Sequence, residues 1–176
     1  MKRYLAISVV VLLCASLSAC RKISDSGAEI VRGVLTALYM QPDAEMLRLI
    51  YQEDNAAYIG VPDPYPGESE YEKACKERFG GLFTEEQYPI FVEEYGKLLT
   101  DCDINGQTLE IEESRVEAAE ETGRYVFTVK CRYGTEAEKR EISGEGWFQF
   151  THAGVIEGFA LPSDIRFYVA NRPVAE

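Results

Sequence analysis

The stretch RYVFTVKCRY, residues 124–133, alternates apolar and polar side chains and thereby decides the fold class. Successive side chains of a β-strand point to opposite faces, so a period of two allows one face to be buried while the other meets solvent. The side chains expected on the buried face are Tyr125, Phe127, Val129, Cys131 and Tyr133. The stretch therefore predicts a strand with one face against a core.

More strands are expected before and after it. The predicted ranges are 108–118, 142–151, 155–161 and a closing edge strand at 165–170. The Glu-rich, Ala-containing end of the first range would also suit a helix. Gly144 and Gly146 are expected to weaken or bulge the second range, and residues 152–154 should form a turn that places His152 in solvent.

The first half of the chain predicts helices instead. Apolar residues at helical spacing and capping signals predict one helix over 26–40 and others that begin at Pro42, Ser69 and Thr84. Three prolines within residues 60–67 exclude regular structure there. Helices followed by antiparallel strands predict a single α+β domain over 26–176, with N-terminal helices packed on one face of a curved sheet.

This order of elements, with the returning strand GVIEGF at 154–159, resembles the cone-shaped nuclear-transport-factor-2-like superfamily over roughly residues 26–161. The resemblance implies a pocket between the sheet and the helices, in which some enzymes of the superfamily, ketosteroid isomerase among them, place an acid or a base. No local motif of those enzymes occurs in this chain. The side chains expected to line such a pocket are Tyr125, Phe127, Tyr133, Phe148, Phe150 and Phe159.

Residues 1–19 have the parts of a secretory signal: Lys2 and Arg3, then an apolar run, then small residues. The run is short for a bilayer span, although an uncleaved anchoring helix is the alternative. Leu17-Ser18-Ala19-Cys20 resembles the lipobox of bacterial lipoproteins. The resemblance implies cleavage before Cys20 and lipid on its thiol, with residues 20–25 as a short tether. Two or three acyl chains anchor a protein stably, so the expected location is extracytoplasmic, on a bacterial membrane.

The charge of the chain also limits its partners. The formal net charge is −12, and removal of residues 1–19 makes it about −14 because Lys2 and Arg3 leave with them. Such a surface repels phosphate backbones, so we expect no nucleic acid partner. The single histidine, His152, excludes any site that needs two imidazoles.

Glu157 is the one catalytic candidate. It shares the predicted face of Val155 and Phe159, and a carboxylate among aromatic side chains has a raised pKa and can act as a general base. The alternatives are an exposed glutamate at the strand end or one paired with Arg140. Because no complete catalytic set is present, we expect a non-enzymatic domain that binds a small ligand or a partner protein, with a pocket enzyme as the alternative.

Residues 101–112 fit the spacing of a calcium-binding loop, D-x-D-x-N-G-x₅-E. Thr108 occupies a position that is normally hydrophobic, and Asp, Asn and Gly are also the usual residues of a helix-to-strand turn. We therefore expect a turn and no cofactor, with a calcium-dependent interaction module as the alternative. The ligands of that alternative would be Asp101, Asp103, Asn105, Gln107 and Glu112.

The remaining signals concern cysteines and the far face of the sheet. A disulfide between Cys75 and Cys102 is feasible outside the cytoplasm, whereas Cys131 should be a buried apolar residue. The side chains of Val126, Trp147 and Ile156 are expected to point away from the helices. That outer sheet face could pair with a second subunit or partner, or be shielded by the tail over 165–176.

Overall fold

The predicted sheet is present as four antiparallel strands in the order β1-β2-β3-β4. The protein was studied as a computed structural model that describes residues 26–58, 69–165 and 169. The predicted signal, Cys20 and the tether lie outside these residues. The strands are β1 (Thr108–Ala118), β2 (Arg124–Gly134), β3 (Lys139–Phe150) and β4 (Ile156–Ala160). The α+β class and all four of these strands are confirmed, including the strand interpretation of residues 108–118.

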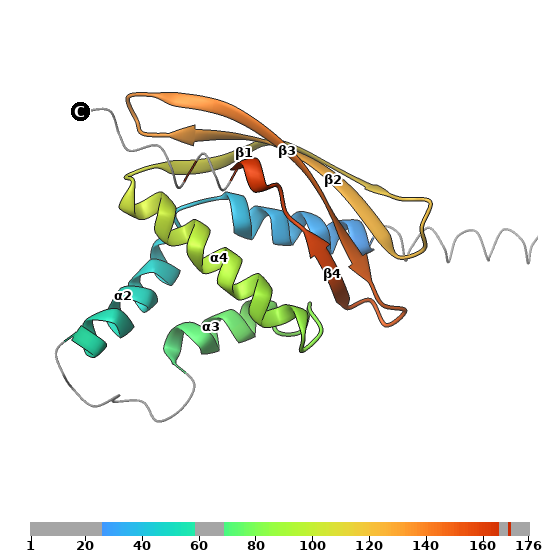
Figure 1. The fold of residues 1–176 in the computed structure, drawn as a ribbon, viewed down its shortest axis with the longest axis horizontal. Helices are drawn as coiled ribbons and strands as arrows, with labels where there is room; N and C mark the ends of the chain where they lie inside the picture. The colour runs from blue at the N-terminus through green and yellow to red at the C-terminus, as the bar shows by residue number, and fades with distance from the viewer. Residues whose placement is uncertain (1–25, 59–68, 166–168, 170–176) are drawn as a thin grey trace, which may run out of the picture.

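The helices precede the sheet in the chain, as predicted. They comprise residues 26–39, α2 (Ala44–Tyr58), α3 (Glu70–Phe79) and α4 (Gln87–Ile104). In Figure 1 the first helix, coloured blue, lies beneath the sheet, α4 crosses below it, and α2 and α3 lie farther from the strands. The helices therefore cover one face of a curved sheet. No helix within the described ranges has the length and apolar composition needed to span a bilayer.

Of the predicted helix starts, that of α3 is confirmed, whereas α2 and α4 begin two and three residues later than predicted. The predicted capping box of α3 is formed, with the Glu72 N–H donating to Ser69 Oγ at 3.0 Å and the Ser69 N–H to Glu72 Oε2 at 2.8 Å. Helix α2 begins at Ala44 rather than Pro42, because Asp43 Oδ1 accepts the Met46 N–H at 3.2 Å. Helix α4 begins at Gln87, and Thr84 Oγ1 accepts only a long 3.4 Å bond from the Gln87 N–H.

Gln41, between the first helix and α2, also hydrogen-bonds to β1, which is far away in the sequence. Its backbone exchanges two hydrogen bonds with Leu109 at the start of β1, at 2.8 and 2.9 Å. Its buried side chain donates to the carbonyls of Ala37 and Leu38 at the end of the first helix and accepts the Asp43 N–H. These bonds satisfy carbonyls that a helix end leaves unpaired and fix the first helix against the edge of the sheet.

The described part of the C-terminal tail lies on the helical side of the sheet. Residues 163–165 and residue 169 are helical, so the predicted closing strand is wrong. Ile165 and Val169 are fully buried in the core, and Asn105 Nδ2 donates to the Val169 carbonyl at 3.1 Å. The tail thus caps the core from the same side as the helices, and its described residues do not shield the outer sheet face.

Gly144 and Gly146 of β3 do not form a bulge; each leaves room for a residue that approaches the strand closely. The β2–β3 register runs without interruption past Gly144 and Gly146. A Cβ on Gly144 would lie 2.3 Å from Pro162 Cβ, and one on Gly146 would lie 2.3 Å from the Ala160 carbonyl oxygen and 2.4 Å from the Phe127 ring. The bulges lie elsewhere, at Ile111–Glu113 of β1 and at Glu157 of β4, opposite Gln149 and Phe150.

A polar cluster on the helical side connects α2, α3 and α4. Asp43 Oδ2 pairs with Arg78 Nη1 at 2.6 Å and accepts the Tyr95 hydroxyl at 3.4 Å. Burial by itself would raise the pKa of Asp43, but the Arg78 hydrogen bond and charge and the backbone donors of α2 outweigh it and hold that pKa below its ordinary value. Ionised Asp43 therefore stabilises the folded chain.

Replacing Asp43 with Asn should cost about 1 kcal/mol of unfolding free energy at pH 7, because the charge pair is lost while Asn can still cap α2. A pKa lowered by folding gives stability that is present above the ordinary pKa and lost as the pH falls through the folded value. The difference between wild type and Asp43→Asn in urea unfolding should therefore narrow from pH 7 to pH 3. Glu70→Gln, which removes the exposed pair with Lys73, is the matched control with little expected effect. A difference in unfolding free energy between wild type and Asp43→Asn that does not change with pH would contradict this role of Asp43.

Candidate functional site: the outer face of the sheet

The six side chains predicted to line a pocket lie on the inner face of the sheet and pack against one another. Phe127 and Phe148 stack with ring centroids 5.5 Å apart, Tyr125 meets Phe150 edge-on at 5.4 Å, and Phe148 lies 6.1 Å from Phe159. All are buried except Phe159, which is partly buried. Their inward orientation is confirmed, and they build the hydrophobic core.

Glu157 does not occupy that aromatic environment. Its side chain is exposed, whereas Ile156, expected on the outer face, is fully buried. Glu157 is the extra residue of a bulge in β4, which sets Ile156 opposite the inward Phe150, and residues 82–84 pair with Ile156 on its other side. The predicted faces of Ile156 and Glu157 are therefore wrong because the bulge shifts the alternation. The alternative of an exposed Glu157 is correct, Arg140 pairs with Glu138, and His152 is exposed in its turn as expected.

Residues 101–112 form a helix-to-strand turn. Asp101 and Asp103 lie within α4, and Gly106, with φ of +60°, ends it: the Gln107 N–H donates to the Cys102 carbonyl and the Gly106 N–H to that of Asp103. Glu112 lies in β1 and pairs with Arg132 and with Lys130. The turn prediction is thus correct. Among the described residues, no group of three or more His, Cys, Asp or Glu side chains could hold a metal ion.

The three cysteines within the described residues are buried and form no disulfide with one another. Cys75, Cys102 and Cys131 are each fully buried, so the suggested Cys75–Cys102 disulfide is not formed. Burial, with smaller contributions from neighbouring carboxylates, raises the pKa of Cys102 and of Cys131 to about 12. Both therefore remain protonated and unreactive, as expected for Cys131.

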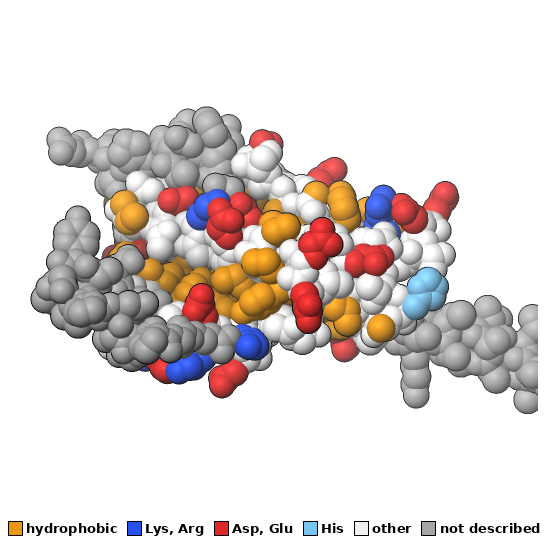
Figure 2. Space-filling model, turned by 60° about the horizontal axis from the view of Figure 1, so that its bottom comes forward, with side chains coloured by type: hydrophobic (Ala, Val, Ile, Leu, Met, Phe, Trp, Pro, Cys, Tyr) orange, Lys and Arg blue, Asp and Glu red, His pale blue; other side chains and the backbone are white. Residues whose placement is uncertain are grey.

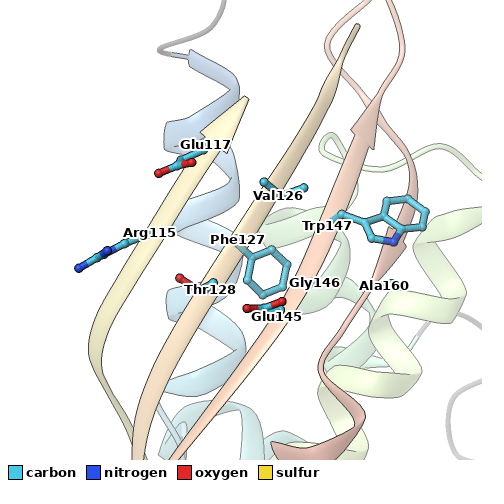
Figure 3. Close-up of a pocket in the computed structure, with 9 residues that line it drawn as sticks. All are labelled: Arg115, Glu117, Val126, Phe127, Thr128, Glu145, Gly146, Trp147 and Ala160. Atoms are coloured by element: carbon cyan, nitrogen blue, oxygen red, sulfur yellow. The ribbon is translucent and has the colours of Figure 1, made fainter. Parts of the chain in front are cut away.

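The outer face of the sheet carries a depression of about 770 Å³. Six outward side chains around it, termed here the outer-face patch, are Arg115, Glu117, Val126, Thr128, Glu145 and Trp147. Figure 3 shows Arg115 and Glu117 on β1 at one side, Trp147 on β3 at the other, and Val126 and Thr128 of β2 between them. Val126 is 42% exposed although it is apolar, so the patch presents hydrophobic surface to solvent.

The indole of Trp147 is held in a fixed position at one side of the patch. The guanidinium carbon of Arg124 lies 4.7 Å from the centroid of the Trp147 ring, a cation–π contact. Arg124 is itself held by Glu121 at 2.6 Å and by the Gln149 side chain at 3.2 Å. The ring also reaches across β4, because a Cβ on Gly158 would meet it at 3.4 Å. The patch is therefore preorganised on that side.

The two ends of the outer face differ in how their charges are paired. Near the β2–β3 hairpin, Lys130 bridges Glu112 and Glu141 at 3.3 and 2.8 Å, and Lys139 pairs with Glu110 at 2.8 Å. In the outer-face patch, the exposed carboxylates of Glu117 and Glu145 form no ion pair with any described residue. The patch thus combines apolar surface with two carboxylates that no described residue neutralises, while its Arg115 pairs with Glu113 at 2.9 Å.

A second depression of about 740 Å³ lies between α2, α3 and α4. Figure 2 turns this helical side forward and shows hydrophobic side chains gathered in a band. Its apolar lining includes Ile50, Tyr71, Tyr88 and Val92, and it borders Ser69, which directly follows a segment outside the described residues. The outer-face patch is the better defined of the two because every strand around it is described.

Comparison with protein-family models, with curated proteins and with solved structures finds no match for this chain. The fold and the patch define an α+β protein with an aromatic core under the sheet and an exposed apolar surface on its other face. Val126 and Trp147 of that surface were predicted from the strand alternation. Arg115, Glu117 and Glu145 were missed, because the alternation does not show which residues lie opposite one another across the strands.

Proposed function

We propose that this protein is a bacterial lipoprotein whose mature domain is held outside the cell membrane by lipid on Cys20 and binds a partner protein through the outer-face patch. The lipobox-like residues at 17–20 support the anchor. Helical structure from residue 26 onward leaves residues 20–25 as the tether, which can extend about 20 Å.

The observation that carries the binding role is the apolar surface of the exposed Val126 and the partly exposed Trp147, beside the carboxylates of Glu117 and Glu145 that pair with no described residue. Interfaces commonly combine an aromatic or apolar centre with a charged rim. The aromatic side chains on the inner face are packed together, and Glu157 is exposed, so the inner face offers less support for a small-ligand pocket or a general base.

The proposed fold is the cone-shaped class of the nuclear-transport-factor-2-like superfamily. Support comes from the helices that lie beneath one face of a curved four-stranded meander. The mature charge of about −14 also suits a tethered domain, because repulsion from anionic headgroups holds the body away from the membrane and keeps its surfaces accessible.

A photo-crosslinking amino acid placed at Thr128 in living cells tests the binding role. Thr128 is exposed at the centre of the outer-face patch, and Glu136, exposed in the β2–β3 hairpin, is the control position. Irradiation should give a discrete adduct from position 128, identified by mass spectrometry, and at least five-fold less from position 136. No adduct at 128, or the same adducts at both positions, would contradict binding through the patch.

A further inference from the structure

We propose that the partner on the outer-face patch is a second copy of this chain, related by a two-fold axis that runs parallel to β2. This inference rests on the proposed function and identifies the partner at the same site. Two copies that meet face to face must present surfaces that complement themselves, because a two-fold interface uses the same patch twice. The charges, the apolar centre and the position of the membrane tether together satisfy this requirement.

The charge pattern of one cross-strand row is self-complementary. Arg115 on β1 lies opposite Thr128 on β2, which lies opposite Glu145 on β3. An axis parallel to β2 places β1 of one copy over β3 of the other. Arg115 then faces the partner's Glu145, and the same contact forms a second time by symmetry. Arg115 pairs with the neighbouring Glu113 at 2.9 Å, but both side chains are largely exposed, at 72% and 57%, so this surface pair contributes little and its guanidinium can turn to a second carboxylate. Glu145 has no ion pair with a described residue.

The next row supplies the apolar centre. Val126 lies between Glu117 on β1 and Trp147 on β3. Under the same axis the two Val126 side chains meet, and Glu117 faces the partner's Trp147, on whose ring the partner's Arg124 is stacked. The negative Glu117 is then close to the partner's Arg124, beside the apolar contact of the two Val126 side chains. Opposite charges at this position favour one defined arrangement of the two copies.

The contact is confined to the patch end of the sheets. The row Glu110–Arg132–Glu141 near the hairpin would place Arg132 against its own copy, an arrangement of like charges. Those charges are already paired within the chain, by Glu112 and Lys139 among others. The sheet curves over the helices, so its outer face is convex, and two such faces that meet at the patch separate toward their hairpin ends (Figure 1).

The position of the tether agrees with this axis, and the charge row favours it over the other face-to-face arrangement. Gly27 lies against Tyr125, since a Cβ there would be 2.5 Å from the Tyr125 hydroxyl, so the first helix begins beside the start of β2. An axis parallel to β2 keeps both chain starts at the same end of the dimer, where two lipids can enter one membrane. An axis across the strands at the Arg115–Thr128–Glu145 row would instead place Arg115 against its own copy and Glu145 against its own copy, two contacts of like charge.

Disulfide trapping in membranes of cells that express the full chain tests the two-fold contact. Thr128→Cys brings two thiols together at the proposed axis, whereas the native Cys75, Cys102 and Cys131 are buried. We expect a disulfide-linked dimer with Thr128→Cys and at least five-fold less with the control Glu136→Cys. The reversals Arg115→Glu and Glu145→Arg, each added to Thr128→Cys, should each reduce the dimer at least five-fold by placing like charges in contact.

Co-expression of the two reversal variants with different tags should restore a mixed dimer, because each acidic row then meets a basic one. Arg115 on β1 and Glu145 on β3 are about 10 Å apart in one chain, too far to pair directly, so a restored dimer would report contact between the two copies. Unchanged melting temperatures of the single variants would show that the fold is intact. Absence of the Thr128→Cys dimer, indifference to the reversals, or failure of the mixed pair would each overturn the second-copy proposal. A heterologous adduct from the crosslinker at position 128 would then leave the proposed binding role standing.

Discussion

Replacing Phe91 with Ala is expected to lower the free energy of unfolding by about 3–5 kcal/mol. The Phe91 side chain on α4 is 0% exposed and stacks on Phe83 with centroids 4.3 Å apart. It also meets Phe79 edge-on at 5.0 Å and Phe159 at 6.0 Å, so it joins α3, α4 and β4. Truncation leaves a cavity that these rings cannot fill without moving, and urea unfolding followed by circular dichroism measures the loss.

Ile90→Ala is the matched control for Phe91→Ala. Ile90 is the preceding residue of the same helix but is 47% exposed, so its truncation should cost less than about 1 kcal/mol. Equal losses from the two variants would show that the aromatic cluster does not organise the core.

The second large effect is expected from the addition of one methyl group, Gly146→Ala. The new Cβ would lie 2.3 Å from the Ala160 carbonyl oxygen and 2.4 Å from the Phe127 ring. The first obstacle is backbone and the second is a buried ring, so neither can move cheaply. We expect a loss of about 3 kcal/mol in unfolding free energy, at the upper end of the usual cost of overpacking.

Gly158→Ala on the neighbouring strand β4 is the control for Gly146→Ala. Its Cβ would meet the Trp147 ring at 3.4 Å and Gln149 Cβ at 3.8 Å, which are ordinary van der Waals distances. Its effect should stay within about 1 kcal/mol. If Gly146→Ala were tolerated equally well, the close approach of β4 and Phe127 at this position would be wrong.

Periodicity predicted the sheet well because each strand has one buried face. Residues 108–118 form β1 with the predicted bounds, and the alternation of 124–133 matches the burial of β2. It failed at β4, where Glu157 is the extra residue of a bulge that shifts the alternation and buries Ile156 in place of Glu157. It also failed at 165–170, where the apolar residues are helical and enter the core, because a short apolar run suits either structure.

Tertiary contacts account for what was missed at the helices and at the candidate site. The backbone hydrogen bonds of Gln41 to Leu109 and the contact of Asp43 with Arg78 join residues far apart in the sequence. At the site, Arg115 comes opposite Thr128 only because the bulge at Ile111–Glu113 sets the register of β1. A pattern within one strand predicts which face a side chain occupies, but the register depends on both strands.

The most direct test of the proposed anchored domain is mass spectrometry of the N-terminal peptide from protein purified out of native membranes. The account predicts a mature chain that begins at Cys20, with a diacylglyceryl group on the thiol and commonly a further acyl chain on the amine. A peptide that retains residues before Cys20, or one that begins there with an unmodified thiol, would contradict the lipid anchor.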